Sequence, residues 1–153
     1  MLRKILIAVV LCLFVAASVS AQQRGTPAEA KKMVEDAIAY IKANGQEKAF
    51  VEINNPRGKF VDRDLYITVI DMNGVCVARG FDPSLLGKNL TDSKDPDGKF
   101  FIKERIEVAK AKGSGWQDYK FTDPLTKNKE VKTLYFEKYG NIIVGCGAYK
   151  PGK

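Results

Sequence analysis

The clearest pattern of apolar and polar positions lies in residues 113–149, where it predicts three consecutive antiparallel strands. Residues 116–121 form a short aromatic segment, and the Thr-Asp-Pro-Leu sequence that follows has the composition of a turn. β-Branched and aromatic residues fill positions 131–138, and a Tyr-Gly-Asn break returns the chain into a third strand at 142–144. The second and third strands therefore form a hairpin with a tight turn.

Four small residues, Gly145-Cys146-Gly147-Ala148, end the third of these strands. Small residues weaken a strand inside a sheet, because they offer little side chain to pack against neighbours. Their presence indicates that another group approaches the backbone closely at this point. A helix or a ligand would fill that role.

Residues 26–53 predict two helices. Thr26 supplies an N-cap and is followed by proline at the first helical position, and apolar residues then recur at helical spacing as far as Ile41. This helix is expected to end near Ala43, because the Asn-Gly pair that follows is typical of a helix terminus. A shorter second helix is expected over residues 46–53.

The middle of the chain predicts a second hairpin, a loop region and another helix. Residues 65–70 are a nearly continuous apolar run, and an Asp-Met-Asn-Gly turn leads into a further apolar run at 75–78. Because neither run has a clearly polar face, both faces of the sheet are expected to be covered. Turn-rich residues 81–99 precede a helix at 100–111. The order of elements predicts an α+β domain on a five-stranded antiparallel sheet.

The first 21 residues have the pattern of a secretory signal peptide. Two basic residues precede an apolar block at 5–19, and a Val-Ser-Ala sequence provides a small-residue cleavage site after Ala21. The block is shorter than the roughly 18 to 20 residues of a membrane-spanning helix, and an uncleaved anchor is the alternative. Residues 22–153 are expected to form one domain, periplasmic or secreted.

The charge pattern bears on the class of partner. The chain has 25 Lys and Arg against 18 Asp and Glu, a formal net charge of +7. Acidic residues are interspersed among the basic ones, which is typical of a solvated mixed surface. We therefore expect no nucleic-acid partner, whereas a modest attraction to anionic ligands is consistent with the net charge.

The sequence gives little support for catalysis. The chain has no histidine, the commonest general base among side chains and a frequent metal ligand. Cys76 and Cys146 remain after the signal peptide, and they form either a disulfide or two small buried strand positions. A thiol oxidoreductase would need them at short spacing. We expect no catalytic residue, metal or cofactor, and hence no enzyme.

One segment matches part of a calcium-loop template at positions 1, 3, 5, 6 and 12, which are Ser93, Asp95, Asp97, Gly98 and Glu104. Against this interpretation, serine occupies the first position, a proline stiffens the loop and no helix precedes it. A turn that leads into the following helix explains the same residues.

The order of these segments resembles a known family. DLYITVIDMNGVCVARG is followed by a Gly-Lys-Asn loop, then by DPDGKFF, GSGWQDYKF with an Asx-Pro turn, VKTLYFEK and IIVGCGAY. From about Thr26 to Lys150 the chain resembles the single Cache domains (sCache type 2), PAS-like extracytoplasmic sensor modules of bacterial chemoreceptors and histidine kinases. The resemblance implies that a long N-terminal helix covers one face of the sheet, and that loops and a helix cover the other.

The resemblance also implies a pocket for a small organic ligand, often a carboxylate or an amino acid, beside the loops after the second strand. By position, Tyr119, Phe121, Lys132 and Tyr135 correspond to the family's Tyr, Trp, Lys and Tyr, and Arg79 stands where many members have histidine. Arginine provides a permanent forked cation in place of a titrating group. On a regular strand Lys132 and Tyr135 face opposite sides, so both reach the pocket only if a bulge intervenes.

These observations lead to the hypothesis of an extracytoplasmic module that binds a small organic acid or amino acid and signals to a membrane partner, a receptor or a kinase. One alternative is an accessory envelope protein that docks on a receptor without binding a ligand. A second alternative is a thiol redox protein, which requires a bond between Cys76 and Cys146. The family's strand order places another strand between these cysteines, beyond ordinary disulfide reach.

Overall fold

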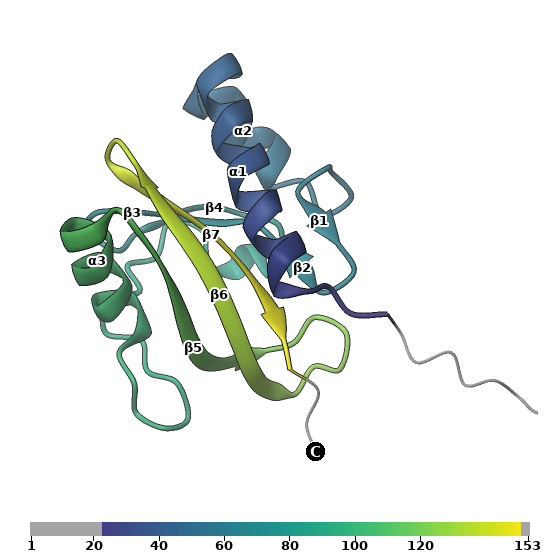
Figure 1. Cartoon of the computed structure of the whole chain (residues 1–153), viewed down its shortest axis with the longest axis vertical. Helices are drawn as coiled ribbons and strands as arrows, with labels where there is room; N and C mark the ends of the chain where they lie inside the picture. The colour runs from purple at the N-terminus through teal and green to yellow at the C-terminus, as the bar shows by residue number, and fades with distance from the viewer. Residues whose placement is uncertain (1–22, 151–153) are drawn as a thin grey trace, which may run out of the picture.

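The computed structural model describes residues 23–150 of the chain. Its main sheet is antiparallel and has the spatial order β4-β3-β7-β6-β5 (Figure 1). The bounds of the strands are β3 Thr68–Asp71, β4 Cys76–Arg79, β5 Ser114–Thr122, β6 Lys129–Tyr139 and β7 Ile142–Tyr149. The five-stranded antiparallel sheet predicted from the sequence is confirmed.

Helix α1 (Pro27–Asn44) begins with a capping box. The Glu29 backbone amide donates to the Thr26 hydroxyl, and the Thr26 amide donates to the Glu29 carboxylate, so two free amides of the first turn are satisfied. The helix ends at Gly45, whose φ of 81° is a conformation that glycine adopts without strain. Helix α2 (Gln46–Ile53) follows directly, as predicted.

Helix α1 lies across one face of the sheet, over β6 and β7 (Figure 1). Alternation along β7 directs Cys146 and Ala148 toward this helix, where both are buried in the same apolar cluster. Small side chains on β7 therefore allow the helix to approach, which is one of the two roles predicted for them. The buried residues of the helix are Ala30, Val34, Ala37, Ile38 and Ile41.

The other face of the sheet is covered by helix α3 (Phe101–Lys112) and by the loop that precedes it. The loop, residues 80–100, includes the short 3-10 helix η1 (Pro83–Leu85). Helix α3 packs against β5 and β6, and Figure 1 shows it on the side of the sheet opposite to α1. The buried apolar residues of this layer include Ile70, Phe101, Ile102, Ile106, Leu134, Phe136 and Ile143.

The predicted strand at residues 65–70 is divided in the structure. Leu65–Tyr66 (β2) pairs with Val61–Asp62 (β1) in a separate two-stranded sheet, and β3 begins only at Thr68. The tight turn that joins β1 and β2 holds Arg63 at a φ of 57°. The apolar run predicted extended backbone correctly, but nothing in its composition distinguishes the two sheets.

Strand β3 lies between the two strands that carry Cys76 and Cys146, as the family's strand order implied. Both cysteines are buried free thiols, and burial raises the pKa of each. No helix within residues 23–150 combines the length and the apolar character needed to cross a membrane. The predicted signal peptide lies outside the described residues.

Candidate ligand-binding site

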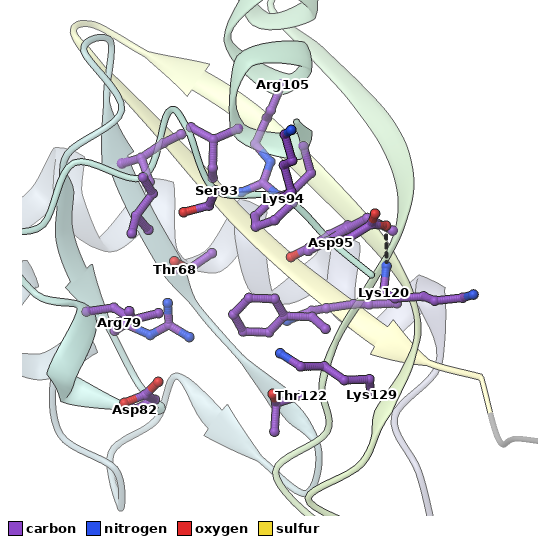
Figure 2. A pocket seen from close by; sticks show the side chains of 18 of the residues that line it. Thr68, Arg79, Asp82, Ser93, Lys94, Asp95, Arg105, Lys120, Thr122 and Lys129 are labelled. Atoms are coloured by element: carbon purple, nitrogen blue, oxygen red, sulfur yellow. Dashed lines mark hydrogen bonds between the residues drawn. The ribbon is translucent and has the colours of Figure 1, made fainter. Parts of the chain in front are cut away.

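A cavity of about 280 Å³ lies between the sheet, helix α3 and the loop before it (Figure 2). Its floor comes from β3 to β6, its far wall from α3, and its cover from the loop residues between Asp82 and Asp95. Cavities of this kind, with apolar and aromatic walls and a few converging polar groups, are the usual form of small-molecule sites. This cavity therefore defines the candidate site.

Four of the five residues predicted to bind a ligand come together in this cavity. They are Arg79, Tyr119, Phe121 and Lys132, which all contribute to its lining. Tyr119 and Phe121 share one face of β5, and the Tyr119 ring stacks on the ring of Phe101 from α3 at a centroid distance of 4.5 Å.

The structure does not bring Tyr135 to the cavity. Strand β6 keeps a continuous register from Lys132 to Tyr135, so no bulge reverses its alternation and the two side chains face opposite sides. The Tyr135 hydroxyl donates to the Glu137 carboxylate at 2.7 Å, and its ring contacts Trp116 on the α1 side of the sheet. The position that the resemblance assigned to the ligand is thus part of the helix-facing layer.

Lys132 is the most deeply enclosed charged group of the site, with 1% of its surface exposed. Its Nζ lies 3.9 Å from the centroid of the Tyr66 ring and 4.9 Å from that of Tyr149. Within residues 23–150, no carboxylate forms an ion pair with it. Burial lowers the pKa of this amine to about 7, and the nearby cations Arg79 and Arg105 act in the same direction.

Gly147 provides the space that the Lys132 side chain occupies. A Cβ atom at this position would lie 2.6 Å from Lys132 Cε and 2.8 Å from Lys132 Cγ, closer than real contacts allow. On this face of β7, the group that approaches the backbone at Gly147 is therefore a side chain from the neighbouring strand, which was not among the two candidates predicted from the sequence.

Replacing Gly147 with alanine is expected to lower the free energy of unfolding by about 1 to 3 kcal/mol, because the added methyl overpacks this contact. Gly145→Ala is the matched control, since the shortest contact of its Cβ would be 3.3 Å, to Leu134 Cδ2 on the same face. Urea denaturation measures both variants. Equal losses for the two variants would show that the Lys132 contact has no special cost.

Two buried arginines add fixed positive charge to the cavity. Arg79 from β4 donates through Nε to the carbonyl of Phe81, and its guanidinium carbon lies 5.6 Å from the Tyr66 ring centroid. Arg105 from α3 donates through Nε to the Gln117 side-chain oxygen at 3.2 Å, while its Nη2 is buried without a hydrogen-bond partner. Figure 2 shows the two side chains extending toward the same space from different elements.

The acids at the cavity are already occupied by partners. The Asp95 carboxylate accepts hydrogen bonds from the backbone amides of Asp97 and Lys99 in the covering loop. It also accepts one from the Lys120 amide, which fastens the loop to β5 (Figure 2). Although burial opposes its charge, these bonds hold the pKa of Asp95 below its ordinary value. The acid at the centre of the calcium-loop pattern thus closes a turn, and the described residues contain no cluster of acids and cysteines placed to hold a metal ion.

Sequence reasoning missed several cavity residues, of which Tyr66 and Arg105 are the most prominent. Arg105 follows the spacing of the buried face of α3, where it lies beside Ile102 and Ile106. An arginine at a position that the helical spacing predicts to be buried was the signal that could have identified Arg105. Tyr66 is two residues before Thr68 and lines the same cavity, but the break between β2 and β3 means that strand alternation alone does not show this.

The residues that line the cavity lie within a segment that matches a known protein family. The family model described as Single Cache domain 2 matches residues 4–150. The chain belongs to the single Cache domain family. The family predicted from the order of its segments is therefore confirmed, together with the PAS-like α+β architecture.

Relatives of this Cache domain include two bacterial chemoreceptors. The methyl-accepting chemotaxis protein CtpM of Pseudomonas aeruginosa is 30% identical over 130 residues, which is 76% of this chain and 22% of CtpM. The methyl-accepting chemotaxis protein McpP of Pseudomonas putida is 27% identical over 90 residues, 58% of this chain and 16% of McpP. The Cache domain thus spans about a fifth of the length of these receptors or less.

Solved structures resemble the Cache domain over most of its length. A methyl-accepting chemotaxis protein from Vibrio parahaemolyticus has a TM-score of 0.69 at 25% identity, covering 80% of this chain and 86% of that one. A Cache chemosensory domain described as recognising a carboxylic acid has a TM-score of 0.65 at 24% identity, covering 81% and 88%.

Proposed function

We propose that this Cache domain is an extracytoplasmic, non-enzymatic sensor module that binds a small carboxylate in the cavity beside Lys132. The observation that carries the proposal is the charge of the cavity. Lys132, Arg79 and Arg105 are buried to 96% or more, and none forms an ion pair with a carboxylate within residues 23–150. Buried charges without partners are costly, so a bound anion would supply the charge that the cavity lacks.

The shape and lining of the cavity limit the size of this ligand. A volume of about 280 Å³ suits a molecule of a few carbon atoms, and the rings of Tyr119 and Phe121 offer apolar contact to its hydrocarbon part. The buried Nη2 of Arg105 supplies a donor that is free to meet a carboxylate oxygen. An acid with a short apolar body fits both features.

Relatives support the same class of function. The chemotaxis proteins CtpM and McpP are receptors, and a domain of the same fold recognises a carboxylic acid. We extend sensing to this chain, with occupancy passed to a membrane receptor or kinase. Residues 1–21 are proposed to direct the domain across the membrane as a signal peptide, so that residues 22–153 act in the periplasm or outside the cell.

Binding of carboxylates can be tested by calorimetry with acetate, succinate and L-aspartate, using acetamide as the uncharged counterpart of acetate. At least one carboxylate is expected to bind and to raise the melting temperature further as its concentration increases, while acetamide does neither. Failure of every carboxylate, or equal binding of acetamide, would contradict the proposed function.

The variant Arg105→Ala is expected to weaken the bound carboxylate by about 1.5 to 3 kcal/mol, roughly 10- to 150-fold in Kd, because a charged hydrogen bond is lost. Arg57→Ala is the control, since this arginine is exposed in a loop outside the cavity lining. Unchanged affinity in Arg105→Ala would remove this arginine from the binding site.

A further inference from the structure

Lys132 is a buried amine enclosed by aromatic rings and by two other cations, and it opens only onto the cavity. Its Nζ has the rings of Tyr66 and Tyr149 within 5 Å and that of Phe121 at 5.9 Å. Within residues 23–150 no carboxylate forms an ion pair with this amine, so an anion in the cavity would be its first ion-pair partner. From this arrangement we propose that the Cache domain binds a proton together with its anionic ligand, and that Lys132 holds this proton.

The ammonium form of Lys132 is disfavoured in the empty cavity and favoured in the occupied one. In the empty cavity, burial and the positive guanidinium groups of Arg79 and Arg105 disfavour a charge on Lys132, which holds the pKa of the amine at about 7. A carboxylate within a few ångströms favours the ammonium form and raises the pKa of the amine. Above neutral pH, the amine that meets the ligand is mostly neutral, so the complex must take up a proton from solvent.

Burial moves the pKa of the other buried acidic groups nearest Lys132 away from neutral pH. Burial raises the pKa of the Tyr66 and Tyr149 phenols, and it raises the pKa of the Cys146 thiol to about 12. The chain has no histidine. The other titratable or charged groups around the cavity are Arg79 on β4, Arg105 on α3, Tyr119 and Lys120 on β5, Lys129 on β6, Asp82, Lys94 and Asp95 in the covering loop, and Asp64 before β2.

The environment of these charged groups supports the same assignment. Asp64 accepts a hydrogen bond from the Gly25 amide and lies 3.6 Å from Arg24. Its charge raises the pKa of Lys132, but burial and the two arginines outweigh this effect and leave the pKa at about 7. Asp95 is held by three backbone amides, and Asp82 accepts from the Ser84 amide. Lys132 is thus a buried cavity amine without an ion-pair partner, and its pKa lies near neutral pH.

The inference rests on the proposed function, and it predicts how the affinity for a carboxylate depends on pH. Well below pH 7 the amine is already mostly charged, so the affinity for a carboxylate should change little with pH. Above pH 7 the affinity should fall by up to tenfold for each pH unit, or about 25-fold between pH 6.5 and pH 8.5. The direction follows from the sign of the linkage, because the complex holds more protons than the free domain.

Calorimetry with acetate at pH 6.5, 7.5 and 8.5 tests this, and titrations at pH 8.5 in buffers of different ionisation enthalpy count the protons taken up. Close to one proton per acetate is the expected result at pH 8.5, and the same titrations at pH 6.5 should give about a quarter of a proton. Binding of acetate with equal affinity at all three pH values and no proton uptake would overturn the inference while leaving the proposed function intact. If acetate does not bind at pH 6.5, both the proton-linked binding and the assignment of acetate as a ligand are wrong.

Two variants assign the proton to its site. Lys132→Met keeps an unbranched side chain but cannot be protonated, so residual acetate binding should be independent of pH, with no proton uptake. Lys132→Arg carries a permanent charge and should bind without pH dependence wherever circular dichroism shows it to be folded. Proton uptake that persists in Lys132→Met would assign the proton to another group and would contradict the role of Lys132.

Discussion

Replacing Arg24 with alanine is expected to lower the free energy of unfolding by about 3 to 5 kcal/mol, because it leaves buried carboxylates without their partner. The Arg24 guanidinium is hydrogen-bonded to Asp123, lies 3.6 Å from Asp64 and donates to Glu130 at 3.1 Å. Asp64 and Asp123 have no exposed surface. Urea denaturation at pH 7 measures the loss.

The matched control is Lys32→Ala, which removes an exposed ion pair with Asp36 on helix α1. A surface pair of this kind contributes about 0.3 to 0.5 kcal/mol, so the control should lose little. Acid gives a second test, because the Arg24 hydrogen bond helps to hold the pKa of Asp123 below its ordinary value. The stabilisation from the pair is therefore lost as pH falls through that pKa, and the difference between the two proteins should narrow. A loss in Arg24→Ala as small as in the control would refute this account.

This ion cluster connects the start of helix α1 to the hairpin that borders the cavity. Asp123 begins the turn after β5 and Glu130 lies on β6, while Arg24 stands two residues before the N-cap of α1. The same two strands carry Phe121 and Lys132 into the cavity. The segment before helix α1 thus contacts the same pair of strands that carries the candidate site. These contacts fix the position of the site relative to helix α1.

The predictions about the fold succeeded where local pattern and tertiary packing agree. The capping residues at Thr26 and Glu29, the helical spacing as far as Ile41 and the aromatic alternation of β5 and β6 all specify their elements locally. The division between β2 and β3 was not predictable in this way. It depends on the pairing of β2 with Val61–Asp62, a segment too short to show any alternation.

The predictions about the site show a different limit. The alternation of side chains along a strand is local information. It predicted that Lys132 and Tyr135 face opposite sides of a regular strand, and the continuous register of β6 shows that they do. The burial of Lys132 was not predictable, because a lysine near a strand end is solvated by default. Its burial depends on Gly147 in the neighbouring strand and on the ring of Tyr66 from another sheet, and only the folded chain brings these together.

Replacing Lys132 with methionine is expected to have opposite effects on binding and on stability. The affinity for a carboxylate should fall about 10- to 150-fold, because a charged hydrogen bond is lost. The unliganded domain should become more stable at pH 6 to 7, since the variant no longer buries an ammonium group among cations. A loss of both binding and stability would indicate instead that the lysine is a structural element of the core.

The pH dependence of stability distinguishes these interpretations most sharply. The pKa of Lys132 is about 7 in the folded domain and near 10.5 in the unfolded chain, so between these values the unfolded state binds more protons. The free energy of unfolding of the unaltered domain should therefore rise relative to Lys132→Met by about 3 kcal/mol between pH 7 and pH 9.5. Lys138→Met, which removes an exposed lysine from the same strand, should follow the unaltered domain. Parallel stability profiles for the unaltered domain and Lys132→Met would show that the buried amine does not titrate near neutral pH, and the proton-linked binding would then lose its physical basis.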